Sequence, residues 1–382
     1  RQEQLEEQMR MEAPEGAQVI ITSYDLLKRD RAAYLGRTFE YEIIDEAQVI
    51  KNAKTQGAKA VKEISANARF ALTGTPVENR LSELWSIFDF LMPGFLYSYR
   101  KFRERYELPI VKNQDPEALT ALRRMTGPFV LRRLKKDVLR ELPGKEERIV
   151  YSAASGRQQK LYTASALKLK EALAGGAWSG NGKLEVLSQL MRLRQICCDP
   201  ALCFEDYTGE SAKLETCVSL IASASAAGHK ILLFSQFASM LERIRERLLQ
   251  EGISSHLLVG ATPKEERSRM VQAFASDEVP VFLISLKAGG TGLNLTAADI
   301  VIHYDPWWNV AAQNQATDRA YRIGQEKPVT VYKLILKDTI EENLLKLQNA
   351  KLALAAQVVS EGMVSLGDLS QNELMELFEQ NP

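Results

Sequence analysis

Apolar runs of strand length alternate with helical segments in two blocks of the sequence, and this alternation limits the fold more than any other feature. Strand, helix, strand repeats are typical of parallel sheets with crossover helices. The first block spans about residues 17–76, the second begins at Lys213, and a helical region lies between them. We therefore predict an α/β protein with two parallel-sheet lobes and helical protrusions between them.

The apolar patterns predict the individual elements. In the first block a buried strand at 17–27 runs into a polar turn, and strands at 39–47 and 68–76 flank a helix at 54–64. Residues 81–140 are expected to be mostly helical and form a protrusion. The second block is expected to hold strands at 229–237, 254–260, 279–285, 299–305 and 329–336, and helices at 238–252, 262–276 and 311–321.

Other segments are expected to connect or extend these blocks. Residues 1–14 are predicted to form a charged helix, 142–151 a connector, and 156–194 a helical region with a flexible interruption. The helix at 262–276 is expected to be capped by Thr262, with Pro263 at its first position.

Composition narrows the class of protein. The chain has 382 residues, too many for one ordinary core, and 45% of them are hydrophobic, as in folded proteins. No apolar run approaches the roughly 20 residues that span a bilayer, so no membrane role is expected. The chain opens at Arg1 without a methionine or signal peptide, so we expect a piece of a longer protein. The four cysteines form no CxxC pair and are expected to be reduced, mostly buried thiols of an intracellular protein and not a metal site: Cys197, Cys198, Cys203 and Cys217.

The formal net charge of zero conceals an uneven distribution. Between Arg123 and Arg140 seven basic residues face one acid, Asp137, whereas residues 338–379 lean acidic. A basic run of this kind is either a solvated helix face or a patch that binds a phosphate backbone.

Two adjacent carboxylates, Asp45 and Glu46, end the apolar strand at 39–47. Such a pair suits a magnesium nucleotide, because Asp45 could hold the metal through its water shell while Glu46 orients or deprotonates the attacking water. The alternative is an ordinary acidic turn after a strand.

Three further segments lie at expected strand ends, where α/β sheets bind ligands. Residues 72–76, "LTGTP", offer two hydroxyls and a glycine, and the glycine-rich loop 286–296 offers amides and threonines to phosphates. In the third segment, Gln315, Arg319 and Arg322 are spaced to share one helix face. Guanidinium groups can neutralise a phosphoryl group in its transition state, although a solvated basic face paired with Asp318 would have the same pattern.

Nine ordered blocks carry a resemblance to a known family: "ITSYD", "DEAQ", "LTGTPVENRLSELWSIFDFL", "LRRLKKDVLRELPGK", "LRQICCDP", "ILLFSQF", "SLKAGGTGLNL", "HYDPWWN" and "QATDRAYRIGQ". Together they closely resemble the Swi/Snf-like family of DNA-dependent ATPases within the helicase-like superfamily two. The resemblance extends from about Val19 to about Leu347. A DEAD-box RNA helicase would share the acidic motif and the arginine segment, but not "DPWWN" or "RIGQ".

The resemblance implies a motor with two RecA-like lobes that hydrolyses ATP with magnesium in the cleft between the lobes and translocates along duplex DNA. It also implies a role for each candidate residue. Asp45 and Glu46 would be the magnesium and water-activating acids, and Arg319 and Arg322 would be the arginine fingers from the second lobe. Further nucleotide-site residues would be Gln48, Gly290, Gly292 and Gln315, and the coupling residues would be Thr73, Gly74 and Thr75. The DNA-facing residues would be Thr22, Ser23, Tyr24, Thr291, Asn294, Trp307 and Trp308. The family places "LRRLKKDV" at the end of the first lobe's protrusion, where its arginines would hold the lobes or contact DNA.

The chain departs from the family pattern in four places. Gln48, Tyr321 and Val310 stand where histidine, histidine and proline are common in relatives, and these changes do not threaten the assignment. The fourth departure is that the chain contains no GxxxxGK[ST] phosphate loop, which the family carries upstream of "ITSYD". We therefore expect ATP hydrolysis by a parent protein and severely weakened triphosphate binding in this chain alone. An alternative is a DNA- or protein-interaction module with a vestigial nucleotide site.

The expected organisation has five parts. They are residues 1–80, the C-terminal part of the first lobe, 81–150, a protrusion and connector, 151–212, the second protrusion, 213–348, the second lobe, and 349–382, a helical tail. The expected partners are duplex DNA and DNA-bound proteins, in a prokaryotic nucleoid by preference or otherwise in a nucleus.

Overall fold

The computed structural model describes residues 19–74, 81–113, 115–133, 135–139, 141–154, 156–175, 182–289, 293–346 and 348. The expected helix at 1–14, the interruption at 176–181 and the tail from 349 lie outside these residues. Contacts divide the chain into two compact units, one ending at Leu131 and the other beginning at Arg132. Within the described residues, no helix is long and apolar enough to cross a membrane.

The first unit contains a parallel pair of strands and a set of helices. Its described elements are α2 (Tyr24–Arg29), α3 (Arg31–Tyr34), β1 (Thr38–Ile44), the 3-10 helix η1 (Ala47–Ile50), α4 (Gln56–Lys62), β2 (Ser65–Ala71), α5 (Leu81–Leu91), α6 (Tyr99–Phe102), the π-helix η2 (Arg103–Glu107), α7 (Leu108–Asn113), α8 (Pro116–Thr126) and the 3-10 helix η3 (Gly127–Phe129).

One face of the strand pair is packed and the other is open. Helices α2, α4 and α5 form a core with β1 that includes Leu27, Val61 and Phe90. On the strands, Tyr41 and Phe70 are at least half exposed, and their rings lie 6.1 Å apart. The protrusion from α5 to α8 has a separate apolar core of its own.

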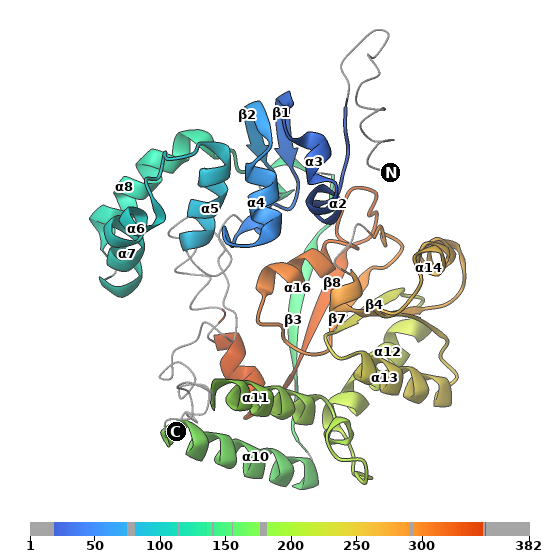
Figure 1. Ribbon diagram of the computed structural model, residues 1–382. Coiled ribbons are helices and arrows are strands. Elements are labelled where there is room, and N and C mark those ends of the chain that lie inside the picture. The colour runs from blue at the N-terminus through green and yellow to red at the C-terminus, as the bar shows by residue number, and fades with distance from the viewer. Residues whose placement is uncertain are drawn as a thin grey trace. The chain divides into compact units, whose positions relative to one another are not determined.

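The second unit is built on a six-stranded sheet in which all neighbouring strands are parallel, in the order β3-β8-β7-β4-β6-β5 (Figure 1). Its described elements are α9 (Lys135–Val138), β3 (Lys145–Ser152), α10 (Gly156–Ala174), α11 (Gly182–Cys198), η4 (Pro200–Leu202), α12 (Ala212–Ala226), β4 (Ile231–Ser235), α13 (Ala238–Gln250), β5 (Ser255–Leu258), α14 (Lys264–Ser276), β6 (Val281–Ser285), α15 (Leu286–Gly289), β7 (Ile300–His303), α16 (Val310–Thr317) and β8 (Val329–Leu336).

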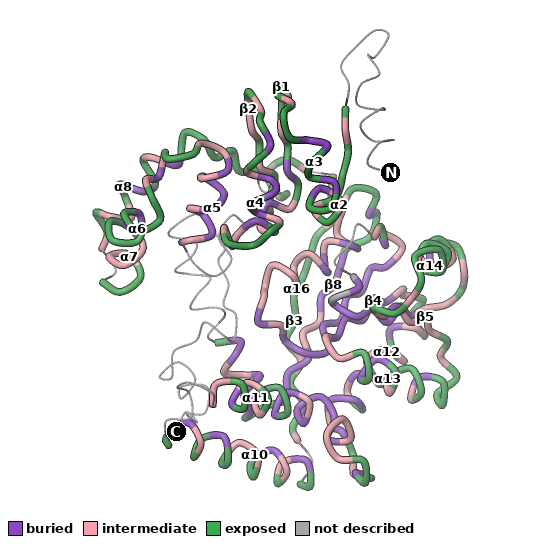
Figure 2. Tube along the Cα trace, in the orientation of Figure 1, coloured by how far each residue is buried: buried purple, intermediate pink, exposed green. Residues whose placement is uncertain are grey.

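Alternate residues of the central strands enter two different cores. On β4, Ile231 and Leu233 pack with α12 and α13, whereas Leu232 and Phe234 pack with α14 and α16. This follows from the two-residue period of a strand. All residues of β4, β6 and β7 are buried (Figure 2), as expected for a parallel sheet covered on both faces.

A third core joins the two helices α10 and α11 to the sheet. Leu169 and Leu190 pack there with Leu336, at the end of β8. The helical region predicted between the two α/β blocks therefore belongs to the second unit, where it packs against the end of β8.

Three sequence expectations are corrected. Residues 19–23 form no strand, Val19 and Ile21 are exposed, and Ser23 caps α2 by accepting a hydrogen bond from the Leu26 amide. The expected connector at 142–151 contains the edge strand β3, whose charged residues hid a strand pattern. Thr262 does not cap α14, because its hydroxyl accepts from the Val259 amide and Pro263 occupies the cap position.

His303, at the end of β7, is packed in the core and not placed in a catalytic setting. It is 1% exposed, and its Nε2 lies 2.8 Å from the hydroxyl oxygen of Thr317. Burial, together with the nearby charge of Lys333, lowers the pKa of His303 to about 3. The folded chain therefore keeps this imidazole neutral under mildly acidic conditions.

We predict that His303 makes the chain acid-labile. Below its ordinary pKa of about 6.5 the unfolded chain binds a proton that the folded chain excludes, so the free energy of unfolding falls as the pH falls, by about 2 kcal/mol between pH 6.5 and 5. Denaturant unfolding at several pH values should show a shallower pH dependence for His303→Asn than for the unchanged chain. Equal slopes would contradict the prediction.

Candidate functional site

The acidic turn Asp45–Glu46 and the segment 72–74 lie side by side where β1 and β2 end. The two strands pair in parallel, with Ile44 opposite Ala71. The backbone ladder continues beyond them, because the Leu72 amide donates to Ile44 and the Ala47 amide donates to Leu72. The pairing therefore places two segments that are 27 residues apart at one edge of the strands.

Side chains link these segments in a relay. The hydroxyl of Thr73 donates to Oε1 of Gln48 at 2.7 Å, and Nε2 of Gln48 donates to Oε2 of Glu46 at 2.5 Å. Because an amide has a donor and an acceptor end, Gln48 fixes both partners at once. The structure thus brings together residues predicted separately as a coupling residue, a nucleotide-site residue and a catalytic acid.

Glu46 has a left-handed backbone conformation, with φ 50° and ψ 53°. Its amide donates to Oδ1 of Asp45 at 2.8 Å, which helps to hold the turn. This conformation costs a residue with a side chain about 1 kcal/mol, and such costs are concentrated at functional sites. The strain supports a functional use of the turn over an ordinary acidic loop.

Tyr24 is tied to the same turn. Its hydroxyl donates to the Asp45 carbonyl at 2.6 Å. Burial, together with the nearby charges of Asp45 and Glu46, raises the pKa of Tyr24 to about 12, so the phenol stays protonated as a donor. Tyr24 was predicted only as a DNA-facing residue; its anchoring of the turn was not visible in the sequence. Its neighbours Thr22 and Ser23 are exposed.

The donor set of this turn fits a magnesium ion that is held mainly by other ligands. Asp45 is exposed, and hard carboxylate oxygens suit Mg²⁺. Among the described residues no group of three acidic, histidine or cysteine side chains could hold a metal. A magnesium ion here would therefore take its remaining ligands from water and nucleotide phosphates, as is usual for this metal.

The predicted helix carrying Gln315, Arg319 and Arg322 ends earlier than expected. Helix α16 stops at Thr317, so Gln315 is helical, whereas both arginines lie in the turns that follow. The Leu295 amide donates to the Arg319 carbonyl at 3.0 Å. Nη1 of Arg322 donates to the Leu293 carbonyl at 3.4 Å. The Tyr321 amide still bonds to the Thr317 carbonyl, but the Arg319 carbonyl accepts from the distant Leu295 and not from a further helical turn.

Gln325 stabilises this turn region. Its side-chain amide donates to the carbonyls of Thr296, Ala298 and Ala320. Asp318 pairs with Lys135 at 2.7 Å, so the acid next to Arg319 is bound to the basic run and not to its own helix face.

The remaining predicted residues are divided between the surface, the core and the undescribed part of the chain. Trp308 is 7% exposed and packed in the core with α11, and Trp307 is partly buried beside α16. Asn294 is exposed, and Gly74 follows Thr73 at the strand end. Outside the described residues lie Thr75, Gly290, Thr291 and Gly292.

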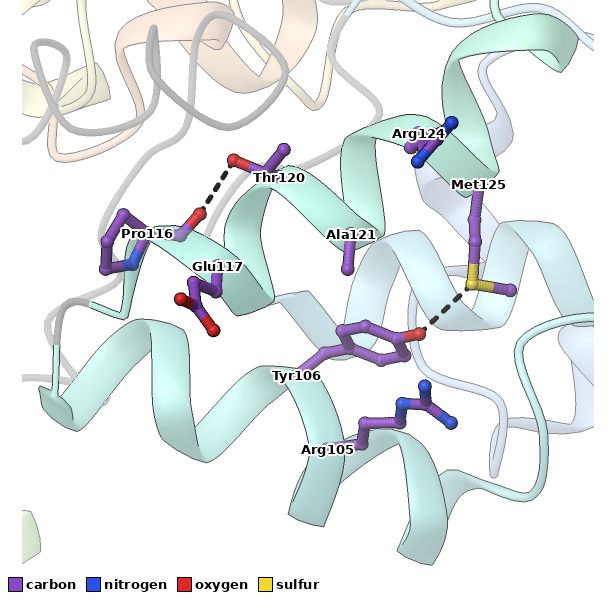
Figure 3. A pocket seen from close by; sticks show the side chains of 8 residues that line it. All are labelled: Arg105, Tyr106, Pro116, Glu117, Thr120, Ala121, Arg124 and Met125. Carbon is purple, nitrogen blue, oxygen red and sulfur yellow. Dashed lines mark hydrogen bonds between the residues drawn. The ribbon is translucent and has the colours of Figure 1, made fainter.

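A cavity of about 600 Å³ lies in the protrusion of the first unit. Figure 3 shows its lining from η2 and α8, with the Tyr106 hydroxyl directed at the Met125 sulfur. None of its lining residues belongs to the predicted site. The acidic turn does not line this cavity, and Asp45 at the end of β1 is exposed.

The two parallel α/β units place the chain among proteins built from two RecA-like lobes, and comparison with known proteins identifies the family. The model of the SNF2-related domain matches residues 2–202, and the helicase conserved C-terminal domain matches residues 212–324. The chain belongs to the SNF2-related family.

Similar proteins agree with this assignment. YwqA of Bacillus subtilis is 42% identical over 378 residues, which cover 95% of this chain and 40% of that protein. An uncharacterized ATP-dependent helicase of Mycoplasma genitalium is 40% identical over 371 residues, which cover 95% of this chain and 35% of that protein. The Sulfolobus solfataricus SWI2/SNF2 ATPase core in complex with dsDNA is 36% identical, with a TM-score of 0.53, and the match covers 94% of this chain and 76% of that structure. The chain thus spans well under half the length of the Bacillus and Mycoplasma relatives.

Two variants test the strain at Glu46. Glu46→Gly and Glu46→Ala both remove the carboxylate, but only glycine adopts the left-handed conformation without a steric cost. We expect the glycine variant to be more stable than the alanine variant by about 1 kcal/mol in denaturant unfolding. Equal stabilities, or a more stable alanine variant, would show that the turn carries no such strain.

Proposed function

We propose that this chain is part of an ATP-driven motor that translocates on duplex DNA and remodels protein–DNA complexes. The observation that carries the proposal is the Thr73–Gln48–Glu46 relay beside Asp45, at the ends of two parallel strands. Membership of the family supports it, as does the similarity to an ATPase core in complex with dsDNA. A mouse relative, 34% identical, is named as a regulator of chromatin.

The proposal gives each residue of the acidic turn a task. Asp45 holds magnesium through water, and a bound magnesium ion would neutralise charge on the nucleotide phosphates. Glu46 orients the attacking water and accepts its proton. Gln48 couples the position of the Thr73 hydroxyl to the position of the Glu46 carboxylate, because one rigid side-chain amide bonds to both.

Other residues are assigned to phosphate charge and to DNA. Arg319 and Arg322 supply guanidinium charge to the phosphoryl group, with Gln315 supporting them and Gly290 and Gly292 close to the nucleotide. The coupling residues Thr73, Gly74 and Thr75 connect the nucleotide state to DNA contacts. The proposed DNA-facing residues are Thr22, Ser23, Tyr24, Thr291, Asn294 and Trp307, whereas the buried Trp308 supports the loop that carries Trp307.

The phosphate loop decides how the proposal is tested. These 382 residues contain no GxxxxGK[ST] sequence, so the experiments require the full-length protein. The proposal places that protein with duplex DNA, in a nucleoid or a nucleus according to the organism.

Glu46→Gln tests the motor directly. In the full-length protein we expect duplex DNA to stimulate ATP hydrolysis, and Glu46→Gln to lower the stimulated rate at least about 100-fold, because the amide cannot accept the proton of water. Duplex DNA binding should persist. Glu40→Gln is the matched control, because Glu40 is an exposed acid of the same strand that accepts a hydrogen bond from Asn67. If Glu46→Gln hydrolyses ATP as fast as the unchanged protein with duplex DNA, the chain is better regarded as an interaction module.

Arg322→Lys tests the arginine assignment. Lysine keeps the charge but lacks the planar fork, so we expect the stimulated rate to fall by about 100-fold while the DNA concentration for half-maximal stimulation changes little. Arg269→Lys, an exposed arginine on α14, is the control and should retain the full rate. A normal rate for Arg322→Lys would remove Arg322 from the site.

A further inference from the structure

Arg194, on helix α11, is an arginine buried in the second unit with 1% of its surface exposed. Its two terminal nitrogens reach two different loops. Nη1 donates to Oε1 of Gln236 at 2.9 Å, and Nη2 donates to the carbonyl of Pro306 at 2.7 Å. The guanidinium also lies 5.4 Å from the ring centre of Trp308. One side chain therefore joins α11 to the loop after β4 and to the loop after β7.

The carboxylate that pairs with Arg194 is that of Asp305, which lies in the loop after β7 and bonds to the loop after β4. Asp305 is 1% exposed and lies 3.7 Å from Nη2 of Arg194. Its Oδ1 accepts a hydrogen bond from the Ser235 hydroxyl at 2.5 Å and another from the Gln236 amide at 3.3 Å. The loop that begins at Asp305 is thus bonded to the end of β4 through Ser235 and to α11 through Arg194.

Stability alone is a poor explanation for this network. Buried ion pairs often contribute no more than apolar residues of the same volume, because both charges lose their hydration. Three buried nitrogens around Arg194 also have no hydrogen-bond acceptor among the described residues: its own Nε, Nε2 of Gln236 and Nε1 of Trp308. A network with this cost and a surplus of donors fixes geometry more effectively than it adds stability.

The loop that Arg194 holds is the one that carries the two tryptophans. Residues 305–308 follow β7 at the carboxyl edge of the sheet, where α/β proteins bind ligands. Arg194 comes from the pair of helices α10 and α11, whose apolar core also contains Trp308 and Leu336. Fixing the loop to this helix pair makes the two move as one body.

We infer that Arg194 is a positioning residue that sets the conformation of loop 305–308 for contact with duplex DNA. The inference rests on the proposed function for its DNA part, and on the Arg194 contacts alone for its positioning part. Arginine is required because its fork reaches Gln236 and Pro306 at once, whereas lysine offers a single point charge.

Hydrogen exchange tests the positioning part without DNA or ATP. In Arg194→Met we expect the amides of Trp307, Trp308 and Asn309 to exchange at least about tenfold faster, while amides of β4, which report global unfolding, change far less. Arg243→Met is the matched control, because Arg243 lies in the same unit and pairs with the buried Asp199 at 2.8 Å. Unchanged exchange at 307–309 in Arg194→Met, or an equal change in the control, overturns the inference.

A titration with duplex DNA tests the DNA part in the full-length protein. We expect the DNA concentration for half-maximal ATPase stimulation to rise about tenfold in Arg194→Met and less than about twofold in Arg243→Met, with Arg194→Lys between them. If Arg194→Met does not fold, Arg194→Lys and Gln236→Leu provide the same two measurements. Faster exchange without a change in the half-maximal concentration overturns the link to DNA. Absence of stimulation in the unchanged protein defeats the proposed function instead, and the exchange data still decide the positioning role.

Discussion

The second unit depends on strands that must bury both of their faces. Strand β4 lies between β6 and β7, and its side chains alternate between two separate cores. A parallel sheet can satisfy this requirement only with helices on both sides, and the crossover connections bring every strand end with the same polarity to one edge. The loops after β4, β6 and β7 therefore lie at one edge, where Asp305 after β7 accepts a hydrogen bond from the Gln236 amide after β4. The same geometry on a smaller scale brings the acidic turn to Thr73 in the first unit.

The relay in the first unit shows how that geometry becomes chemistry. Backbone bonds beyond the last paired residues hold Ala47 to Leu72, and this leaves Gln48 and Thr73 within hydrogen-bonding distance. Glu46 then reaches Gln48 from a left-handed conformation that few residues with a side chain adopt. The strain is offset by hydrogen bonds around the turn, including the one from Tyr24 to the Asp45 carbonyl. A site held this firmly loses little further freedom when a ligand binds.

The sequence predicted those parts of the fold that depend on local apolar patterns. The central strands were found because their runs are short, apolar and rich in β-branched residues. Strand β3 was missed because its exposed edge is charged from Lys145 to Arg148, a pattern that resembles a linker. The early end of α16 was missed because two bonds compete with the helix. The Leu295 amide, from a distant segment, donates to the Arg319 carbonyl, and the Gln325 side chain donates to the Ala320 carbonyl. In the site, the order of motifs at strand ends predicted that Asp45 and Thr73 would meet, but not the conformation of Glu46.

Two buried ion pairs show why long-range polar contacts are the hardest features to predict. Lys213 and Glu341 lie 128 residues apart. Arg194 lies 112 residues from Pro306, which follows its ion-pair partner Asp305, so no local spacing relates either pair. The first pair ties α12 to the segment after β8, since Glu341 also accepts from the Leu336 amide. The second ties α11 to two loops at the carboxyl edge. Both place charge where apolar side chains would fold as well, so their common contribution is to fix the helices that surround the sheet to the strand ends.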